Sequence, residues 1–160
     1  PHLRTEPIRG NVETRIGKVD AGLFDATLLA EAGLTRLDMK DVTRYPISEE
    51  IIVPAPGQAA IAVQTRDEDG ELQTLLQQIH DAKTEREVTI ERSLLKRLGG
   101  GCALPLGCVC HIEGETAELR VFYANASGTE HYLATHRSPL SDIDTLLSQL
   151  IERLQHITTA

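Results

Sequence analysis

Hydrophobic positions with helical spacing appear early in the chain. Apolar side chains recur there at intervals of three or four residues: Val12, Ile16 and Val19. With Asn11 in the N-cap position, this spacing predicts a helix over residues 11–21, ended by Gly22. The apolar stretch that follows, residues 23–30, lies between two glycines. Its length and position predict a buried strand that runs into a short helical turn.

The middle of the chain has a break between two hydrophobic patterns. An extended run over residues 51–53 stops at Pro-Ala-Pro-Gly, residues 54–57, which predicts a hinge at a domain crossing. An extended pattern resumes over residues 59–65. After an acidic turn, a helical pattern begins, formed by Leu72, Leu75, Leu76 and Ile79. Within the first fifty residues, the strand predicted over residues 23–30 cannot form a sheet by itself. We therefore expect these fifty residues to be an incomplete α/β unit.

The second half of the chain has the pattern of a closed domain. Thr84 followed by Glu87 is a capping box, which predicts the start of a helix that ends at glycines 99–101. Three extended runs follow, separated by turns: residues 107–113, 118–125 and 130–137. Helical spacing returns over residues 141–157. Residues 84–160 therefore predict a self-sufficient α+β domain with the order α-β-β-β-α.

Composition and charge mainly exclude partners. The chain has 160 residues, of which 41% are hydrophobic and 25% charged, as in ordinary globular proteins. No apolar run is long enough to span a membrane. The 16 basic and 24 acidic residues give a net charge of −8, which opposes general attraction to nucleic acid or to an anionic membrane surface. We therefore expect neither as a partner, and any bound anion must be captured locally.

The cysteines are the first candidates for chemistry. There are three in one short stretch: Cys102, Cys108 and Cys110. An odd number so close together fits a reducing compartment better than a disulfide framework. Cys102 directly follows three glycines, which let a bulky group approach the backbone, so it is expected to be an accessible thiol beside such a group. The alternative is a flexible helix stop followed by an incidental small residue.

A second cysteine cluster has a poor match to metal chemistry. Cys108, Cys110 and His111 could act as ligands, but the chain lacks a second cysteine pair and the usual zinc spacing. We therefore expect no metal, and we expect the two thiols to be buried or half-buried on one face of a strand.

Two arginines near the start of the chain suggest an anion site. Arg9 lies just before the predicted N-cap, and Arg15 lies about one turn into the predicted helix. Free amides at a helix start, the helix dipole and a guanidinium together favour a carboxylate or phosphate. The alternative is that both arginines are solvated surface residues.

Four stretches form a specific combination. They are RGNVETR at residues 9–15, DA and LAEAGL within residues 25–34, PAPGQ at residues 54–58, and ER leading to LGGGCALPLG over residues 91–107. In order and spacing they resemble the motifs of the porphobilinogen deaminase (hydroxymethylbilane synthase) family over nearly the whole chain. The family pattern usually has glycine where this chain has Ala59, a change that forbids little unless that position needs a positive φ.

The resemblance implies a fold and a domain plan. The chain would be the C-terminal half of an enzyme with three α/β domains. Residues 1–53 would be the later part of the second domain, within a periplasmic-binding-protein-like α/β pair. Residues 54–80 would form the hinge and the return segment of the first domain, and residues 81–160 a complete third domain that carries the cofactor cysteine. The N-terminal half of the same protein would be the partner.

The resemblance also implies an activity. The family belongs to the transferases of tetrapyrrole, porphyrin and heme biosynthesis, and it polymerises four porphobilinogen molecules into hydroxymethylbilane with loss of ammonia. Cys102 would carry a dipyrromethane cofactor through a thioether. Arg9, Arg15 and Arg36 would bind the carboxylates of porphobilinogen and of the growing pyrrole chain.

The resemblance places the carboxylate that handles protons in the N-terminal half, so we expect no catalytic residue in this chain. We expect a cytoplasmic monomer, inactive as this piece alone. The alternative is a non-catalytic truncated relative that acts as an anion-binding module.

Overall fold

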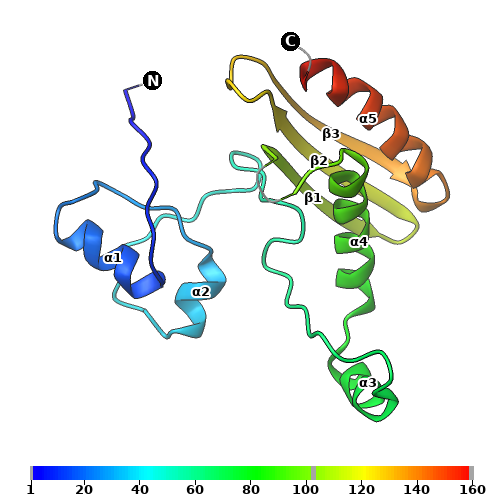
Figure 1. Ribbon diagram of the computed structural model, residues 1–160, viewed down its shortest axis with the longest axis horizontal. Helices are drawn as coiled ribbons and strands as arrows, with labels where there is room; N and C mark the ends of the chain where they lie inside the picture. Colours follow the sequence, from blue (N-terminus) through cyan, green and yellow to red (C-terminus); the bar gives the residue numbers. More distant parts are fainter. Residues whose placement is uncertain (1, 102–103, 159–160) are drawn as a thin grey trace. The chain divides into compact units, whose positions relative to one another are not determined.

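The computed structural model describes residues 2–101 and 104–158. The chain divides between Pro46 and Ile47 into two compact units, and each is described by itself. Figure 1 labels the helices and strands of both. In the described residues no helix is both long enough and apolar enough to cross a lipid bilayer.

The first unit contains two short helices. Helix α1 spans Val12–Asp20, and Asn11 caps it by accepting the Thr14 amide at 2.8 Å, so the predicted helix and its cap are confirmed. Helix α2 spans Glu31–Arg36 and buries Leu34. The strand predicted over residues 23–30 is wrong for the described structure, in which these residues join no sheet.

The physical reason for this error is the absence of a pairing strand. Leu23 and Leu28 are 69% and 67% exposed, although their sequence pattern is that of a buried element. A strand needs a neighbour for its backbone hydrogen bonds, and no described residue pairs with this segment. The segment therefore has the sequence pattern of a buried strand, although its leucines Leu23 and Leu28 are largely exposed.

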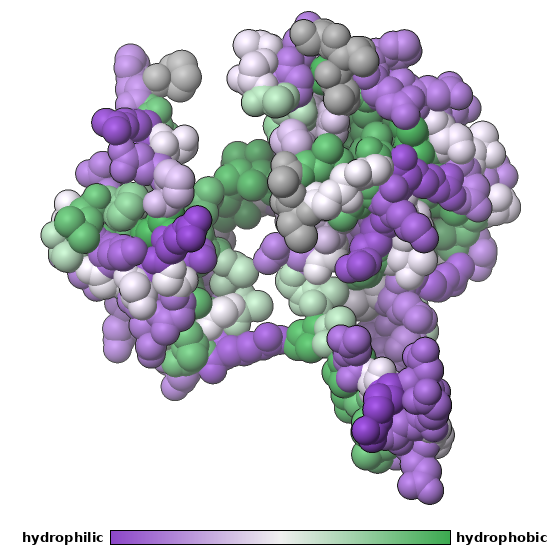
Figure 2. All heavy atoms as spheres, in the orientation of Figure 1, coloured by the Kyte–Doolittle hydropathy of each residue, from purple (hydrophilic) through white to green (hydrophobic). Residues whose placement is uncertain are grey.

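The same mismatch occurs at the start of the second unit. Residues 59–65 form no strand, and Ile61 is 70% exposed. Helix α3, Gly70–Leu76, is followed by the 3-10 turn η1, Gln77–Ile79, as the leucine spacing predicts. The apolar side chains of this helix and turn remain largely exposed, with Ile79 at 72%. Figure 2 shows hydrophobic atoms on the surface of both units.

The start of helix α4, Ala82–Arg97, differs from the prediction. The N-cap is Asp81, whose carboxylate accepts the Thr84 amide at 2.8 Å, so the capping box from Thr84 is wrong. This hydrogen bond is the main reason that the Asp81 pKa lies below its usual value. Aspartate is at least as good an N-cap as threonine, and it starts the helix three residues earlier.

The rest of the second unit matches the predicted α-β-β-β-α order. Strands β1 (Leu106–Glu113), β2 (Thr116–Ala124) and β3 (His131–Pro139) form an antiparallel sheet in that order, which confirms the predicted meander. After the 3-10 turn η2, Leu140–Asp142, helix α5 spans Ile143–Thr158. Both α4 and α5 pack against the sheet (Figure 1), and the core contains Leu94, Leu119, Val121, Leu147, Leu150 and Leu154. This combination of helices with a three-stranded antiparallel sheet agrees with the predicted fold class.

Candidate functional site

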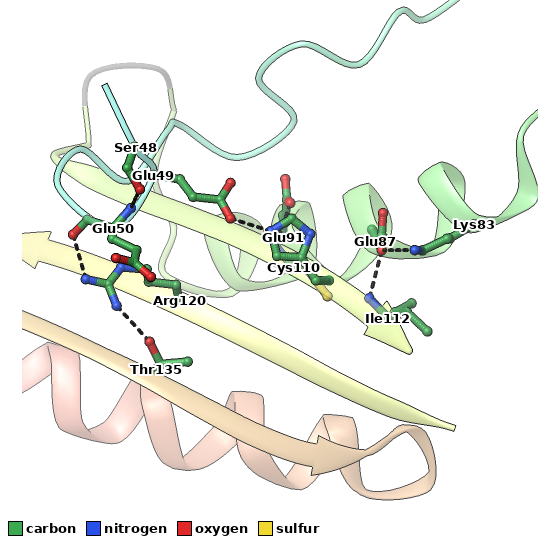
Figure 3. Close-up of polar contacts among 11 residues, drawn as sticks. Ser48, Glu49, Glu50, Lys83, Glu87, Glu91, Cys110, Ile112, Arg120 and Thr135 are labelled. Carbon is green, nitrogen blue, oxygen red and sulfur yellow. Dashed lines mark hydrogen bonds and ion pairs between the residues drawn. The ribbon is translucent and has the colours of Figure 1, made fainter. Parts of the chain in front are cut away.

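The outer edge of β1 is closed by groups from outside the sheet. Three of its amides donate to such groups: those of Cys108, Cys110 and Ile112. The Pro54 carbonyl accepts the first at 2.8 Å, Glu91 of α4 the second at 2.9 Å, and Glu87 of α4 the third at 2.7 Å. Figure 3 shows both glutamates beside the strand. Glu87 thus accepts a hydrogen bond from the sheet and takes no part in a capping box.

The segment before Gln58 follows this edge, and we call residues 49–58 the hinge segment. Glu49 lies 2.6 Å from the His111 ring, and this hydrogen bond is the main cause that raises the His111 pKa. The Glu50 carbonyl accepts a hydrogen bond of 2.7 Å from Arg120 (Figure 3). A Cβ at position 107 would lie 2.6 Å from the Val53 carbonyl oxygen, so glycine is required there.

Glu91 joins the hinge segment to the sheet. Its side chain is buried, with the residue only 6% exposed. One carboxylate oxygen accepts the Gly57 amide at 2.7 Å, and the other accepts the Cys110 amide. Burial raises the Glu91 pKa, and the two amide donors act in the opposite direction. One carboxylate therefore fixes the glycine of the Pro-Ala-Pro-Gly motif against β1.

The residue that directly follows the hinge segment has a strained backbone. Ala59 has a φ of +70°, in the left-handed region that favours glycine, which is the residue that the family resemblance leads us to expect at this position. We expect Ala59→Gly to raise the free energy of unfolding by about 0.5–1 kcal/mol, because relief of strain exceeds the entropy that glycine adds to the unfolded chain.

Urea denaturation followed by tyrosine fluorescence measures this change, since Tyr123 and Tyr132 lie in the sheet. Ala55→Gly is the control, because Ala55 is not among the described residues with positive φ and should lose stability. Equal effects of the two substitutions would contradict the assignment of strain to Ala59.

Two of the cysteines are sealed in the core. Cys108 and Cys110 are 0% and 2% exposed, which confirms the prediction of buried strand thiols. Burial, helped by the nearby Glu91 carboxylate, raises the pKa of Cys110 to about 12 and that of Cys108 further still. Neither group forms a useful amount of thiolate near neutral pH, so neither is suited to nucleophilic chemistry. Among the described residues, no group of three or more potential ligands can hold a metal ion.

This burial predicts a difference in thiol reactivity. Under native conditions we expect iodoacetamide to leave Cys108 and Cys110 unmodified, because the reagent attacks exposed thiolates. In denaturant both should react at the rate of ordinary thiols. Peptide mass mapping of the protein after timed alkylation measures the two rates. Rapid native labelling of either cysteine would show that the β1 core opens readily, contrary to its burial.

The third cysteine, Cys102, lies outside the described residues, and only its flanking backbone bears on the prediction. Gly99 has a φ of +71°. A Cβ at Gly100 would lie 2.5 Å from the Leu104 side chain, whereas one at Gly101 would meet nothing within 4 Å. The first two glycines thus have conformational or packing reasons to be present, and the described residues show no such reason for the third.

The predicted arginines lie in the first unit. The Arg15 side chain donates through Nε to the Gly10 carbonyl at 2.9 Å, so this half-buried guanidinium is held at the start of α1. Arg9 is exposed, and its carbonyl accepts a hydrogen bond from Lys18. Arg36 is exposed at the end of α2. Within the described residues, no hydrogen bond links Arg36 to the other two arginines.

Sequence reasoning missed the roles of Glu87 and Glu91. Both lie on the side of α4 that also carries Leu94 and Leu98, at spacings of three or four residues. A charged residue inside an apolar helical stripe is a signal of a buried hydrogen-bonded group, because an unpaired buried charge is costly. This signal was present in the sequence, although the bonding partners were not.

In its described residues the chain thus combines a unit with two short helices and a unit with an α-β-β-β-α domain, in which the Pro-Ala-Pro-Gly segment is held against β1. Two family sequence models match it. Residues 1–74 match "Porphobilinogen deaminase, dipyromethane cofactor binding domain", and residues 85–142 match "Porphobilinogen deaminase, C-terminal domain". The chain belongs to the porphobilinogen deaminase family. Membership implies a pyrrole-polymerising function in porphyrin and heme biosynthesis and a dipyrromethane cofactor.

Proposed function

We propose that this chain is the C-terminal part of a transferase that joins four porphobilinogen molecules into hydroxymethylbilane, with loss of ammonia at each condensation. Family membership supports the reaction class. The observation that carries the site assignment is the burial of Cys108 and Cys110, which leaves Cys102 as the cysteine suited to anchor a cofactor.

The residues present fit a dipyrromethane group. Cys102 would hold it through a thioether, next to a glycine run in which position 101 leaves open space. When bound, the cofactor supplies the pyrrole to which the first porphobilinogen is joined. The chain's own contribution is to bind and orient. Arg9, Arg15 and Arg36 would hold the acetate and propionate groups of the pyrroles through charge-assisted hydrogen bonds.

Arg15 is the best prepared of these arginines. Its Nε is already bonded to the Gly10 carbonyl, which restricts the side chain before any ligand arrives. The two terminal nitrogens have no hydrogen-bond or ion-pair partner among the described residues, so they can receive a carboxylate in the bidentate geometry that guanidinium groups favour.

The uncovered apolar segments support a partner. Leu23 and Leu28 in the first unit, and Ile61 and Ile79 in the second, have the sequence pattern of buried elements but are largely exposed. We propose that the N-terminal half of the same protein covers them and supplies the carboxylate that handles protons. In this plan the enzyme is cytoplasmic and monomeric. Residues 1–53 belong to its second domain, residues 54–80 to the hinge and the return segment of its first domain, and residues 81–160 to its third domain.

A complementation assay tests the proposal. The chain is incubated with porphobilinogen alone and after co-expression with the separately encoded N-terminal half, and hydroxymethylbilane is measured. We expect activity only with both halves, and intact-mass and peptide analysis should find a two-pyrrole adduct on Cys102. A folded but inactive complex would favour the alternative, a non-catalytic anion-binding module. Full activity with unmodified Cys102 would rule out the cofactor anchor.

A further inference from the structure

A groove runs along the C-terminal half of α4 beside the glycine run. Its volume is about 580 Å³, within the range of small-molecule pockets. Its polar and glycine lining is Thr89, Arg92, Ser93, Lys96, Gly99 and Gly100, with Leu95 as an apolar wall. One residue, Gly101, separates this lining from Cys102 in the sequence.

The groove presents two cations without acidic partners. Arg92 and Lys96 are exposed and lie one helical turn apart, and no ion pair joins either to a carboxylate among the described residues. Like charges at this spacing repel each other and destabilise a helix. Glu91 is next in sequence, but its carboxylate is buried and bonded to two amides. An anion in the groove would relieve this repulsion.

The helix dipole explains only one of these cations. Basic residues are favoured in the last turn of a helix, where the unpaired carbonyls carry partial negative charge. Lys96 lies in that turn, as does Arg97, which pairs with Asp144. Arg92 lies one turn earlier, where this effect has faded. The helix dipole therefore does not account for Arg92, whereas an anion bound in the groove would pair with it.

The remaining lining favours a flat ligand with carboxylate arms. The Ser93 hydroxyl already donates to the Thr89 carbonyl at 2.8 Å, so the anion donors are Arg92, Lys96 and the Thr89 hydroxyl. Leu95 and the two glycines leave an apolar surface without long side chains. This combination matches a pyrrole that bears acetate and propionate groups.

We propose that the α4 groove is an additional carboxylate-binding subsite, in which Arg92 and Lys96 hold acetate and propionate groups of pyrroles. This proposal rests on the proposed function for the identity of the ligand. The groove's lining ends at Gly100, two residues before Cys102 in the sequence. Pyrroles attached to this cysteine would therefore be tethered close to the groove. Arg9, Arg15 and Arg36 belong to the other unit.

Titration of the 160-residue chain with porphobilinogen, followed by NMR, tests the subsite. We expect saturable shifts at the amides of residues 89–100 and at the Arg92 Nε–H. The double variant Arg92→Gln/Lys96→Gln should weaken this binding about tenfold or more, as expected for loss of charge-assisted hydrogen bonds. The control Lys83→Gln/Arg86→Gln removes the same charge from the first turns of the same helix and should bind like the parent. The probe 2-(aminomethyl)pyrrole, which lacks both carboxylates, should cause no such shifts.

The outcomes separate this proposal from the proposed function. Unchanged binding in Arg92→Gln/Lys96→Gln, equal losses in the control, or shifts confined to the first unit would overturn the subsite, even if the complementation assay succeeds. Specific shifts in the groove together with a folded but inactive complex would support the subsite and count against the enzyme. If the two cations instead pair with an acidic group of the N-terminal half, complex formation will suppress the porphobilinogen shifts and overturn the subsite.

Discussion

Replacing Cys102 by serine will abolish cofactor attachment and reduce hydroxymethylbilane synthesis by the complex of the two proposed halves to background. A hydroxyl ionises far less readily than a thiol, so serine lacks the nucleophile that forms the thioether. In the proposed function, the variant would lack the primer for the first condensation. Intact mass and the rate of hydroxymethylbilane formation measure the two effects together.

The other two cysteines provide matched controls. Cys108→Ala and Cys110→Ala each remove a buried thiol that has a raised pKa. Each variant should keep the two-pyrrole adduct and lose stability by about 1 kcal/mol, because a small cavity is left in the core. Loss of the adduct in either folded control, or its retention in Cys102→Ser, would contradict the assignment of the anchor.

Glu91→Ala will lower the free energy of unfolding of the second unit by about 3 kcal/mol. The substitution leaves the amides of Gly57 and Cys110 without their acceptor, and a buried unsatisfied donor costs about 1–3 kcal/mol. Removal of a buried charge offsets part of this cost. Urea denaturation followed by tyrosine fluorescence measures the change. Glu152→Ala, at an exposed position of α5, is the control and should change stability by less than about 0.5 kcal/mol.

The pH dependence gives a second test of Glu91. Because burial raises its pKa above the ordinary value of 4.5, the native state binds more protons than the unfolded state between that value and the raised one. This group's contribution to stability is therefore lost as the pH rises through that window. Glu91→Gln removes the contribution, so its stability should fall less steeply with pH there than that of the parent. Parallel pH profiles of the two proteins would contradict the role of burial.

The parts of the fold that could be predicted have local partners. The three strands of the meander pair with their sequence neighbours, and the turns between them contain glycine. Alternation and turn residues therefore suffice to place them. Helix α1 likewise has its cap, Asn11, directly beside it. Arg9 and Arg15 were placed at a helix start for the same reason.

The parts that failed depend on distant or absent partners. The segment over residues 23–30 has the composition of a strand, but no described strand lies beside it. Glu91 bonds to residues 34 and 19 positions away, and no local pattern specifies such contacts. The N-cap error is different, because Asp81 and Thr84 are both good caps and only the observed hydrogen bond distinguishes them.

The closed edge of β1 has a consequence for solubility. An exposed edge strand with free amides is a template on which other chains can add strands and aggregate. Here the amides at positions 108, 110 and 112 are occupied by Pro54, Glu91 and Glu87. The hinge segment and helix α4 together thus protect this edge against intermolecular strand addition. Because two of these three acceptors belong to α4, the amides of Cys110 and Ile112 should stay occupied even after proteolytic cleavage within residues 49–58.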